Sequence, residues 1–197
     1  MGYVINTPAA LAPRVAGLID GIIRREGGFV DHPDDPGGAT CWGITERVAR
    51  RNGYQGAMRD MPKAFARQVY VRQYIEAPRF DDVYDIAPLL AEEMIDTGVN
   101  CGIGVPGKFL QQALNAFNQQ ATVYRDIAVD GIIGQNTLAM LEAYLEYRAR
   151  EDGERVMLKA LDCLQGARYL ELAERNQRFE SFVFGWMAHR IGNIEAH

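Results

Sequence analysis

The first strong structural pattern in the sequence lies at residues 15–28, which read VAGLIDGIIRREGG. Its apolar residues recur at the i, i+3, i+4, i+7 and i+8 spacing that puts side chains on one face of an α-helix: Val15, Leu18, Ile19, Ile22 and Ile23. Two glycines follow at 27 and 28, and glycine commonly ends a helix because it tolerates the left-handed conformation. We therefore expect an amphipathic helix that stops at these glycines.

A glutamate occupies the next position on the apolar stripe. Glu26 follows Ile22 and Ile23 by four and three residues, so we expect it to be partly buried. Burial penalises a charged carboxylate, and the negative end of the helix dipole does the same. A carboxyl group that keeps its proton near neutral pH suits a general acid for glycoside cleavage. The alternative is a solvated residue beside a helix end, paired with Arg24 or Arg25.

A loop rich in Asp, Pro and Gly follows at residues 31–38. Eight residues separate Glu26 from Asp35, and four separate Asp35 from Thr40. An inverting glycosidase needs a second carboxylate and a group that orients water, so we take Glu26, Asp35 and Thr40 as catalytic candidates around one cleft. The alternative is an ordinary turn. An EF-hand is excluded, because proline and tryptophan stand where that loop requires glycine and glutamate.

The remaining pattern predicts a mainly α fold. Phe29-Val30 and Trp42-Gly43-Ile44 flank the loop and are expected to pair as a small β-hairpin beside the first helix end. Helical periodicity resumes through Arg47, and glycines at 98, 102 and 104 are expected to break the chain. Further helices are expected over 62–74, from Pro88, from Pro106, around Leu138–Leu145, and from Glu154 onward.

Composition narrows the classes of function. The chain has 197 residues, 48% of them hydrophobic, which is enough to form a core. Its net charge of −5 argues against a nucleic-acid partner, which usually requires a basic face. No run of 18 apolar residues is present, so we expect no stable membrane insertion. The first ten residues do not resemble a secretory signal, so we expect synthesis in the cytoplasm.

Other catalytic chemistries find little support in the residue pattern. The three cysteines, Cys41, Cys101 and Cys163, are far apart and are expected to be reduced thiols. The only serine lies outside a Gly-x-Ser-x-Gly context, and the histidines form no zinc motif. We expect no metal site and no organic cofactor.

Several motifs together resemble glycoside hydrolase family 108, the muramidases of phage endolysins and prophages. The specific pair is Glu26-Gly27-Gly28-Phe29 and Asp35-Pro36-Gly37-Gly38-Ala39-Thr40, followed by Gly43-Ile44. The resemblance implies a lysozyme-like helical fold, Glu26 as the catalytic acid, and Asp35 and Thr40 as its partners. In the more distantly similar phage-type lysozymes, five residues separate the second catalytic residue from the threonine. Counted from Asp35, this spacing would place the threonine at Cys41.

The resemblance extends to residue 192 and suggests substrate-binding residues. It covers the aromatic stretch at 69–74, the segment 96–102, the Asp-Gly-x-x-Gly-x-x-Thr segment at 130–137, and Phe184-Gly185-Trp186 with Arg190. Trp42, Tyr70, Tyr74 and Asn100 become candidates for contacts with sugar. From residue types alone Trp42 is equally typical of a core aromatic residue, and Tyr70 and Tyr74 are more often a packing pair on a helix face. Asn100 would then belong to a solvated helix face.

The domain organisation implied is a catalytic region over 1–103 and a helical peptidoglycan-binding-like region over 104–197. The implied activity is hydrolysis of the β-1,4 bond between N-acetylmuramic acid and N-acetylglucosamine. The partner is then the peptidoglycan glycan strand, reached in the periplasm after release from the bacterial host cytoplasm, with the enzyme expected to be a monomer. A non-catalytic wall-binding protein and a lytic transglycosylase are the alternatives.

Overall fold

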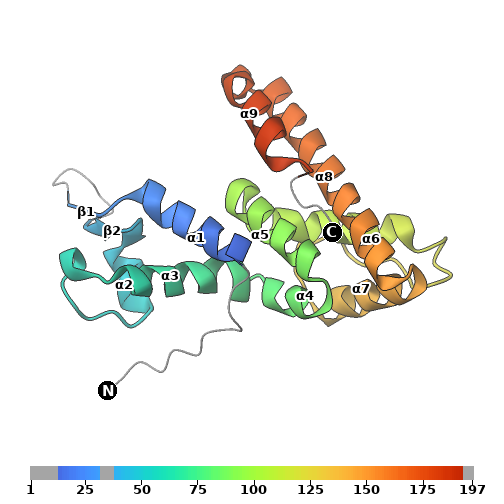
Figure 1. The fold of residues 1–197 in the computed structure, drawn as a ribbon, viewed down its shortest axis with the longest axis horizontal. Helices are drawn as coiled ribbons and strands as arrows, with labels where there is room; N and C mark the ends of the chain where they lie inside the picture. Colours follow the sequence, from blue (N-terminus) through green and yellow to red (C-terminus); the bar gives the residue numbers. More distant parts are fainter. Residues whose placement is uncertain (1–12, 32–37, 193–197) are drawn as a thin grey trace. The chain divides into compact units, whose positions relative to one another are not determined.

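The computed structural model describes residues 13–31 and 38–192. Asp35, one of the predicted catalytic residues, lies outside these ranges. The described chain is mostly helical with one small antiparallel sheet, so the predicted mainly α fold with a small β element is confirmed (Figure 1). None of the helices in the described ranges is long and apolar enough to cross a membrane.

The chain divides into two compact units, Met1–Ile75 and Glu76–His197. The first unit begins with α1 (Pro13–Glu26), whose predicted start and end are close to those observed. Side by side with it runs α3 (Lys63–Val71), and the two helices bury Val15, Ile19, Ile23, Ala66 and Val69 (Figure 1). An ion pair joins Arg67 of α3 to Asp20 of α1 at 3.2 Å.

The β element of this unit is a three-stranded sheet in the order β1-β2-β3. Its strands are β1 (Phe29–Val30), β2 (Thr40–Cys41) and β3 (Ile44–Thr45), and Phe29 pairs with Cys41. The expected pairing of Phe29-Val30 with residues 42–44 is therefore wrong. Trp42 and Gly43 form the turn between β2 and β3. Both residues have positive φ, as the two-residue type I′ hairpin turn requires. Residues in this conformation do not form the hydrogen bonds of a β-ladder.

Short helical elements complete the first unit. Thr45 caps α2 (Glu46–Arg51), because its side chain accepts a hydrogen bond from the Val48 amide. A single 3₁₀ turn, η1 (Met58–Asp60), then leads into α3. After α3 the chain makes a π-helical turn, η2 (Arg72–Glu76), and such turns occur frequently at functional sites.

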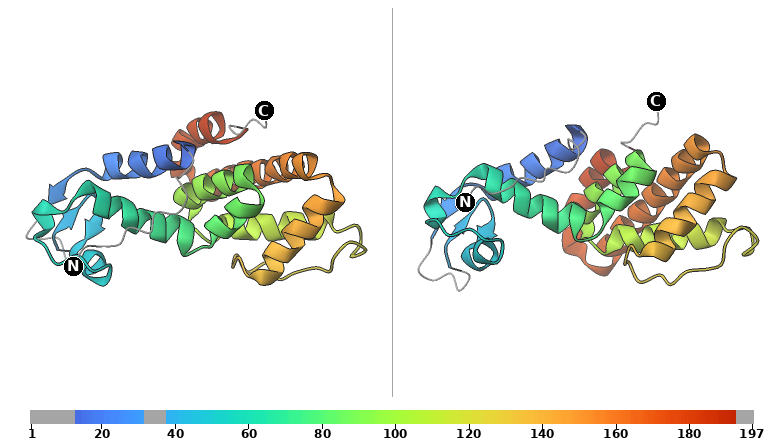
Figure 2. Two further views of the ribbon diagram at one scale, coloured as in Figure 1. Left: turned by 60° about the horizontal axis from the view of Figure 1, so that its bottom comes forward. Right: turned by 90° about the horizontal axis from the view of Figure 1, so that it is seen from below.

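The second unit is a bundle around one long helix, α8 (Arg150–Arg175). It packs against four others: α5 (Pro88–Cys101), α6 (Val105–Phe117), α7 (Gln135–Tyr147) and α9 (Glu180–Arg190) (Figures 1 and 2). α4 (Phe80–Ile86) lies against α5, and the 3₁₀ turn η3 (Gln177–Phe179) connects α8 to α9. The core includes Leu90, Leu110, Leu141, Tyr144 and Met157.

Gly98 does not interrupt α5, contrary to the prediction from its sequence. It is buried inside the helix, and a Cβ at this position would stand 3.3 Å from the ring of Phe80. Its small size therefore serves helix packing, and this outweighs its low helix propensity. The helix ends three residues later, before Gly102, whose φ is +98°.

Buried polar contacts attach α5 to the C-terminal helices. Gln165 of α8 donates to Thr97 at 2.9 Å, and Thr97 donates to Glu93 at 3.2 Å. Asp96, which is 3% exposed, pairs with Arg190 of α9 at 2.8 Å. Since a buried carboxylate is costly without a partner, α5 and α9 depend on each other.

Replacing Asp96 with Ala should therefore lower the free energy of unfolding by roughly 2–3 kcal/mol, because it leaves the guanidinium of Arg190 without its carboxylate partner. The arginine side chain is 27% exposed, which places the loss below that of a fully buried pair. Asp152→Ala breaks the exposed pair with Arg155 and should cause no measurable change. Urea unfolding of both variants checks this; equal midpoints would contradict it.

Candidate active site

Glu26 is the last residue of α1, and it is exposed. The expectation that it lies on the buried stripe is wrong. Packing of α1 against α3 buries residues as far as Ile23, whereas Arg24, Arg25 and Glu26 in the last turn all face solvent. Gly27 then leaves the helix with φ +77°. In the part of the chain that the structure describes, no ion pair connects Glu26 to either arginine.

The β2–β3 turn is anchored at three points. The Trp42 amide donates to the Gly28 carbonyl at 3.4 Å, and its indole N–H donates to the Met61 carbonyl at 3.0 Å. The Tyr70 hydroxyl donates to the Trp42 carbonyl at 2.9 Å. Trp42 has φ 54°, which is uncommon for a bulky residue, and these hydrogen bonds hold it there. Its half-buried indole thus anchors the turn.

The Glu26 side chain packs against this turn at Gly43. A Cβ at residue 43 would stand 2.7 Å from Cγ of Glu26, 2.8 Å from its Cβ and 2.5 Å from the Tyr70 hydroxyl oxygen. These separations are too short for a side chain, so only glycine fits, and φ +74° at Gly43 adds a second requirement for it. The aliphatic part of Glu26 is thereby positioned while its residue remains open to solvent.

Tyr70 connects the turn to α3. It is 5% exposed, and burial, followed by the nearby charge of Glu26, raises the pKa of Tyr70 to about 12. The phenol therefore stays protonated at neutral pH and remains the donor to Trp42. Tyr74, in the π-helical turn η2, stacks on Tyr70 with ring centroids 6.1 Å apart and is half-buried.

The remaining predicted site residues lie in different places. Thr40 is half-buried in β2, where it pairs with Val30 and Thr45 in the same sheet as the turn. Asn100 belongs to the second unit, is exposed on α5, and donates its amide to the Asp96 carbonyl at 2.7 Å. The structure therefore gathers Glu26, Trp42, Tyr70 and Tyr74, with Thr40 in the adjoining strand.

Two residues of this region were not predicted. Gly43 belongs to the Gly43-Ile44 motif, but its contact with Glu26 was not predicted. The signal that could have indicated it is a glycine at the second position of a two-residue hairpin loop. The second is Arg59 in η1, whose guanidinium lies 5.6 Å from the ring centroid of Phe29. A contact across 30 positions leaves no periodic trace in the sequence.

The thiols take no part in this arrangement. Cys41, Cys101 and Cys163 are all free. Cys41 is buried in β2, and burial raises the pKa of its thiol, so it is a poor nucleophile. Among the residues that the structure describes, no group of three or more His, Cys, Asp or Glu side chains is arranged to hold a metal ion.

Glycoside hydrolases act through Asp or Glu carboxyl groups beside the bond that they cleave, and Glu26 presents a carboxyl group to solvent. Residues 19–102 match the family model described as Glycosyl hydrolase 108, and residues 105–191 match the Predicted Peptidoglycan domain. The protein is a lysozyme-type glycoside hydrolase that acts on peptidoglycan. The part of the chain that is similar to the glycosyl hydrolase 108 family ends at residue 102, and the match to the peptidoglycan domain follows directly at residue 105.

The structure of Brucella abortus SagA is 22% identical to this chain, with a TM-score of 0.46, over 88% of this chain and 95% of that chain. No curated protein matches the chain.

The family segments and the compact units divide the chain differently. The glycosyl hydrolase 108 match runs to residue 102, whereas the first compact unit ends at Ile75. Helices α4 and α5 thus belong to the segment that matches the glycosidase family, but they lie in the second compact unit. The functional boundary near residue 103 stays a prediction.

Gly43→Ala should reduce peptidoglycan cleavage about 10²-fold or more, because the new Cβ displaces Glu26 or Tyr70 and misplacement by about 1 Å has that effect. Gly17→Ala is the matched control, since Gly17 lies in the same helix as Glu26 with nothing within 4 Å. Release of reducing ends from purified cell walls is measured, with circular dichroism to verify folding. A folded Gly43→Ala enzyme with full activity would show that the turn does not position Glu26.

Proposed function

We propose that this chain is an N-acetylmuramidase that cleaves the β-1,4 bond between N-acetylmuramic acid and N-acetylglucosamine. The observation that carries the proposal is the placement of Glu26, whose stem lies against Gly43 beside the Tyr70 hydroxyl while the residue is exposed at the end of α1. Such a group is accessible to a polymer that cannot enter a closed pocket.

In the proposed reaction Glu26 is the general acid. It donates its proton to the bridging oxygen as the bond from the muramic acid C1 to that oxygen breaks, and N-acetylglucosamine leaves with a hydroxyl at C4. Water adds its oxygen to C1, and its remaining proton passes to a base. A bound sugar covers Glu26 and removes water from the site of proton transfer.

Asp35 and Thr40 are proposed to act on the water or on the positive charge that develops at the sugar ring. Thr40 lies in the strand that leads into the Trp42-Gly43 turn, which supports a place near Glu26. Tyr74 is proposed to contact sugar, because its half-buried ring is stacked on Tyr70 and leaves part of its surface open. Asn100 is proposed as a contact to an N-acetyl group of the glycan.

Glu26→Gln should fold and lose about 10²–10⁴-fold of activity, the usual contribution of general acid catalysis. Glu46→Gln, at an exposed carboxylate of α2 that only pairs with Arg50, should retain wild-type activity. Mass spectrometry of the fragments tests the bond cleaved. A reducing muramic acid end is expected, whereas an end lighter by one water would identify a lytic transglycosylase.

The same variants test the proposed role as an endolysin that reaches the wall after release from the cytoplasm. Cells that express the wild-type chain should lyse when chloroform opens the inner membrane, and cells that express Glu26→Gln should not. A folded Glu26→Gln enzyme with more than half of wild-type activity would exclude Glu26 as the acid. A folded wild-type protein that binds walls without cutting them would support the non-catalytic alternative.

Asp35→Asn should lose most of the activity if the carboxylate assists water, because the amide cannot accept a proton. Asp34→Asn is the matched control one residue away and should retain near-wild-type activity. If these residues serve only to form a turn, Asn substitutes well at both positions, since Asn and Asp make similar local hydrogen bonds. Equal, near-wild-type cleavage by both variants would remove Asp35 from the mechanism.

A further inference from the structure

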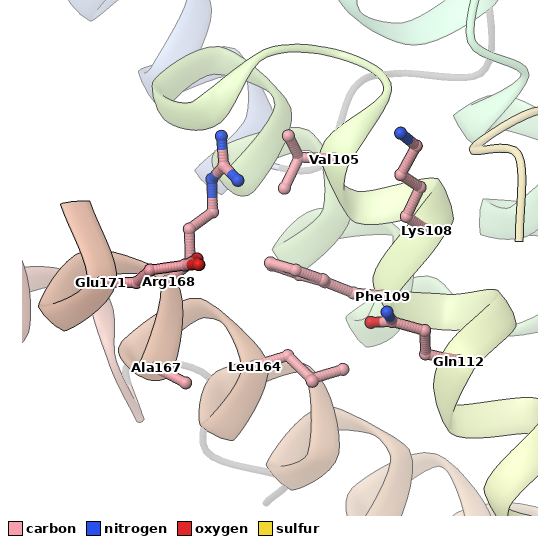
Figure 3. Close-up of a pocket in the computed structure, with 8 residues that line it drawn as sticks. All are labelled: Val105, Lys108, Phe109, Gln112, Leu164, Ala167, Arg168 and Glu171. Atoms are coloured by element: carbon pink, nitrogen blue, oxygen red, sulfur yellow. The ribbon is translucent and has the colours of Figure 1, made fainter. Parts of the chain in front are cut away.

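A groove of about 590 Å³ runs between α6 and α8 of the second unit, within the segment that matches the peptidoglycan domain (Figure 3). It is separate from the residues around Glu26, because both of its helices belong to the other compact unit. The side chains that matter for its chemistry are Val105, Lys108, Phe109, Leu164, Arg168 and Glu171.

The groove offers small apolar contacts. The ring of Phe109 points into the space between the helices in Figure 3, with Leu164 on the opposite helix and Val105 one turn earlier on α6. Phe109 is only 8% exposed, so little of its ring face is available. A pyranose needs an open aromatic face to stack on, and this floor suits methyl-sized side chains better.

The polar groups of the groove favour an anionic ligand. Lys108 is exposed, and Arg168 is half-buried with its Nε buried and without a hydrogen-bond partner in the described structure. The Arg168 side chain also interacts with the Cys101 thiol. Among the lining residues the carboxylate of Glu171 is already engaged by Arg175. Lys108 and Arg168 thus line the groove of a chain whose net charge is −5, with Asp130 near Lys108.

We propose that this groove binds the peptide stem of peptidoglycan through its carboxylates. The stem combines alanine methyl groups with free carboxylates, which matches an apolar floor beside a lysine and an arginine. Arg168 would pair with a carboxylate through its guanidinium group, and Lys108 would add a second, solvent-exposed contact. The inference rests on the proposed function, since it presumes that peptidoglycan is the substrate.

The test measures binding of a synthetic stem tripeptide, alanyl-γ-glutamyl-diaminopimelate, to the full chain by isothermal titration calorimetry. Arg168→Gln should weaken binding about tenfold, because a hydrogen bond to a charged group is lost. Lys108→Glu should weaken it to a similar extent by charge reversal, and this exposed position keeps the test valid if Arg168→Gln does not fold. Lys159→Gln, exposed on α8 and outside the groove, should bind like the wild type.

A tripeptide whose carboxylates are converted to amides should also bind at least tenfold more weakly to the wild type. The proposal is overturned if the tripeptide does not bind at millimolar concentration, if neither Arg168→Gln nor Lys108→Glu alters binding, or if peptide-free glycan strands compete for the groove. Cleavage of peptide-free strands is measured separately. Strands that are cut without tripeptide binding refute only this inference, and tripeptide binding without cleavage refutes only the muramidase activity.

Discussion

The hydrogen bond from the Tyr70 hydroxyl to the Trp42 carbonyl is the contact on which the arrangement of this site depends. A tryptophan in the left-handed region costs on the order of 1–2 kcal/mol, so the turn persists only because several anchors hold it. With the turn in place, Gly43 presents a flat backbone surface to the Glu26 stem. The orientation of a group at the end of one helix is thus set by a phenol on another helix.

Helix α5 connects the two sequence families within one fold. Helix α5 lies in the glycosyl hydrolase 108 segment, yet its buried Asp96 pairs with Arg190 and its Thr97 accepts a hydrogen bond from Gln165. Arg190 and Gln165 lie in the peptidoglycan-domain segment. The Leu90 amide also donates to Glu154 of α8. Because these contacts join polar groups of both segments, the peptidoglycan domain relies on a helix that precedes its own sequence match.

Periodicity and turn chemistry were sufficient to predict the mainly α fold, the limits of α1 and the approximate positions of the other helices. They failed where tertiary contacts override a local rule: Gly98 stays helical because Phe80 packs on it. The stripe rule extended the buried face of α1 to Glu26, but burial depends on what the helix packs against, and the buried residues of α1 end at Ile23. The Gly43–Glu26–Tyr70 contact joins three distant segments, which no local pattern records.

The exposure of Glu26 also fits the physical nature of the proposed substrate. A carboxyl group buried in the free enzyme would require permanent desolvation, which destabilises the fold wherever the group is charged. Here the stem is positioned by packing and the residue remains in water, so low-dielectric surroundings arise only when a glycan strand covers the helix end. Under the proposed mechanism, acid catalysis by Glu26 therefore depends on substrate binding.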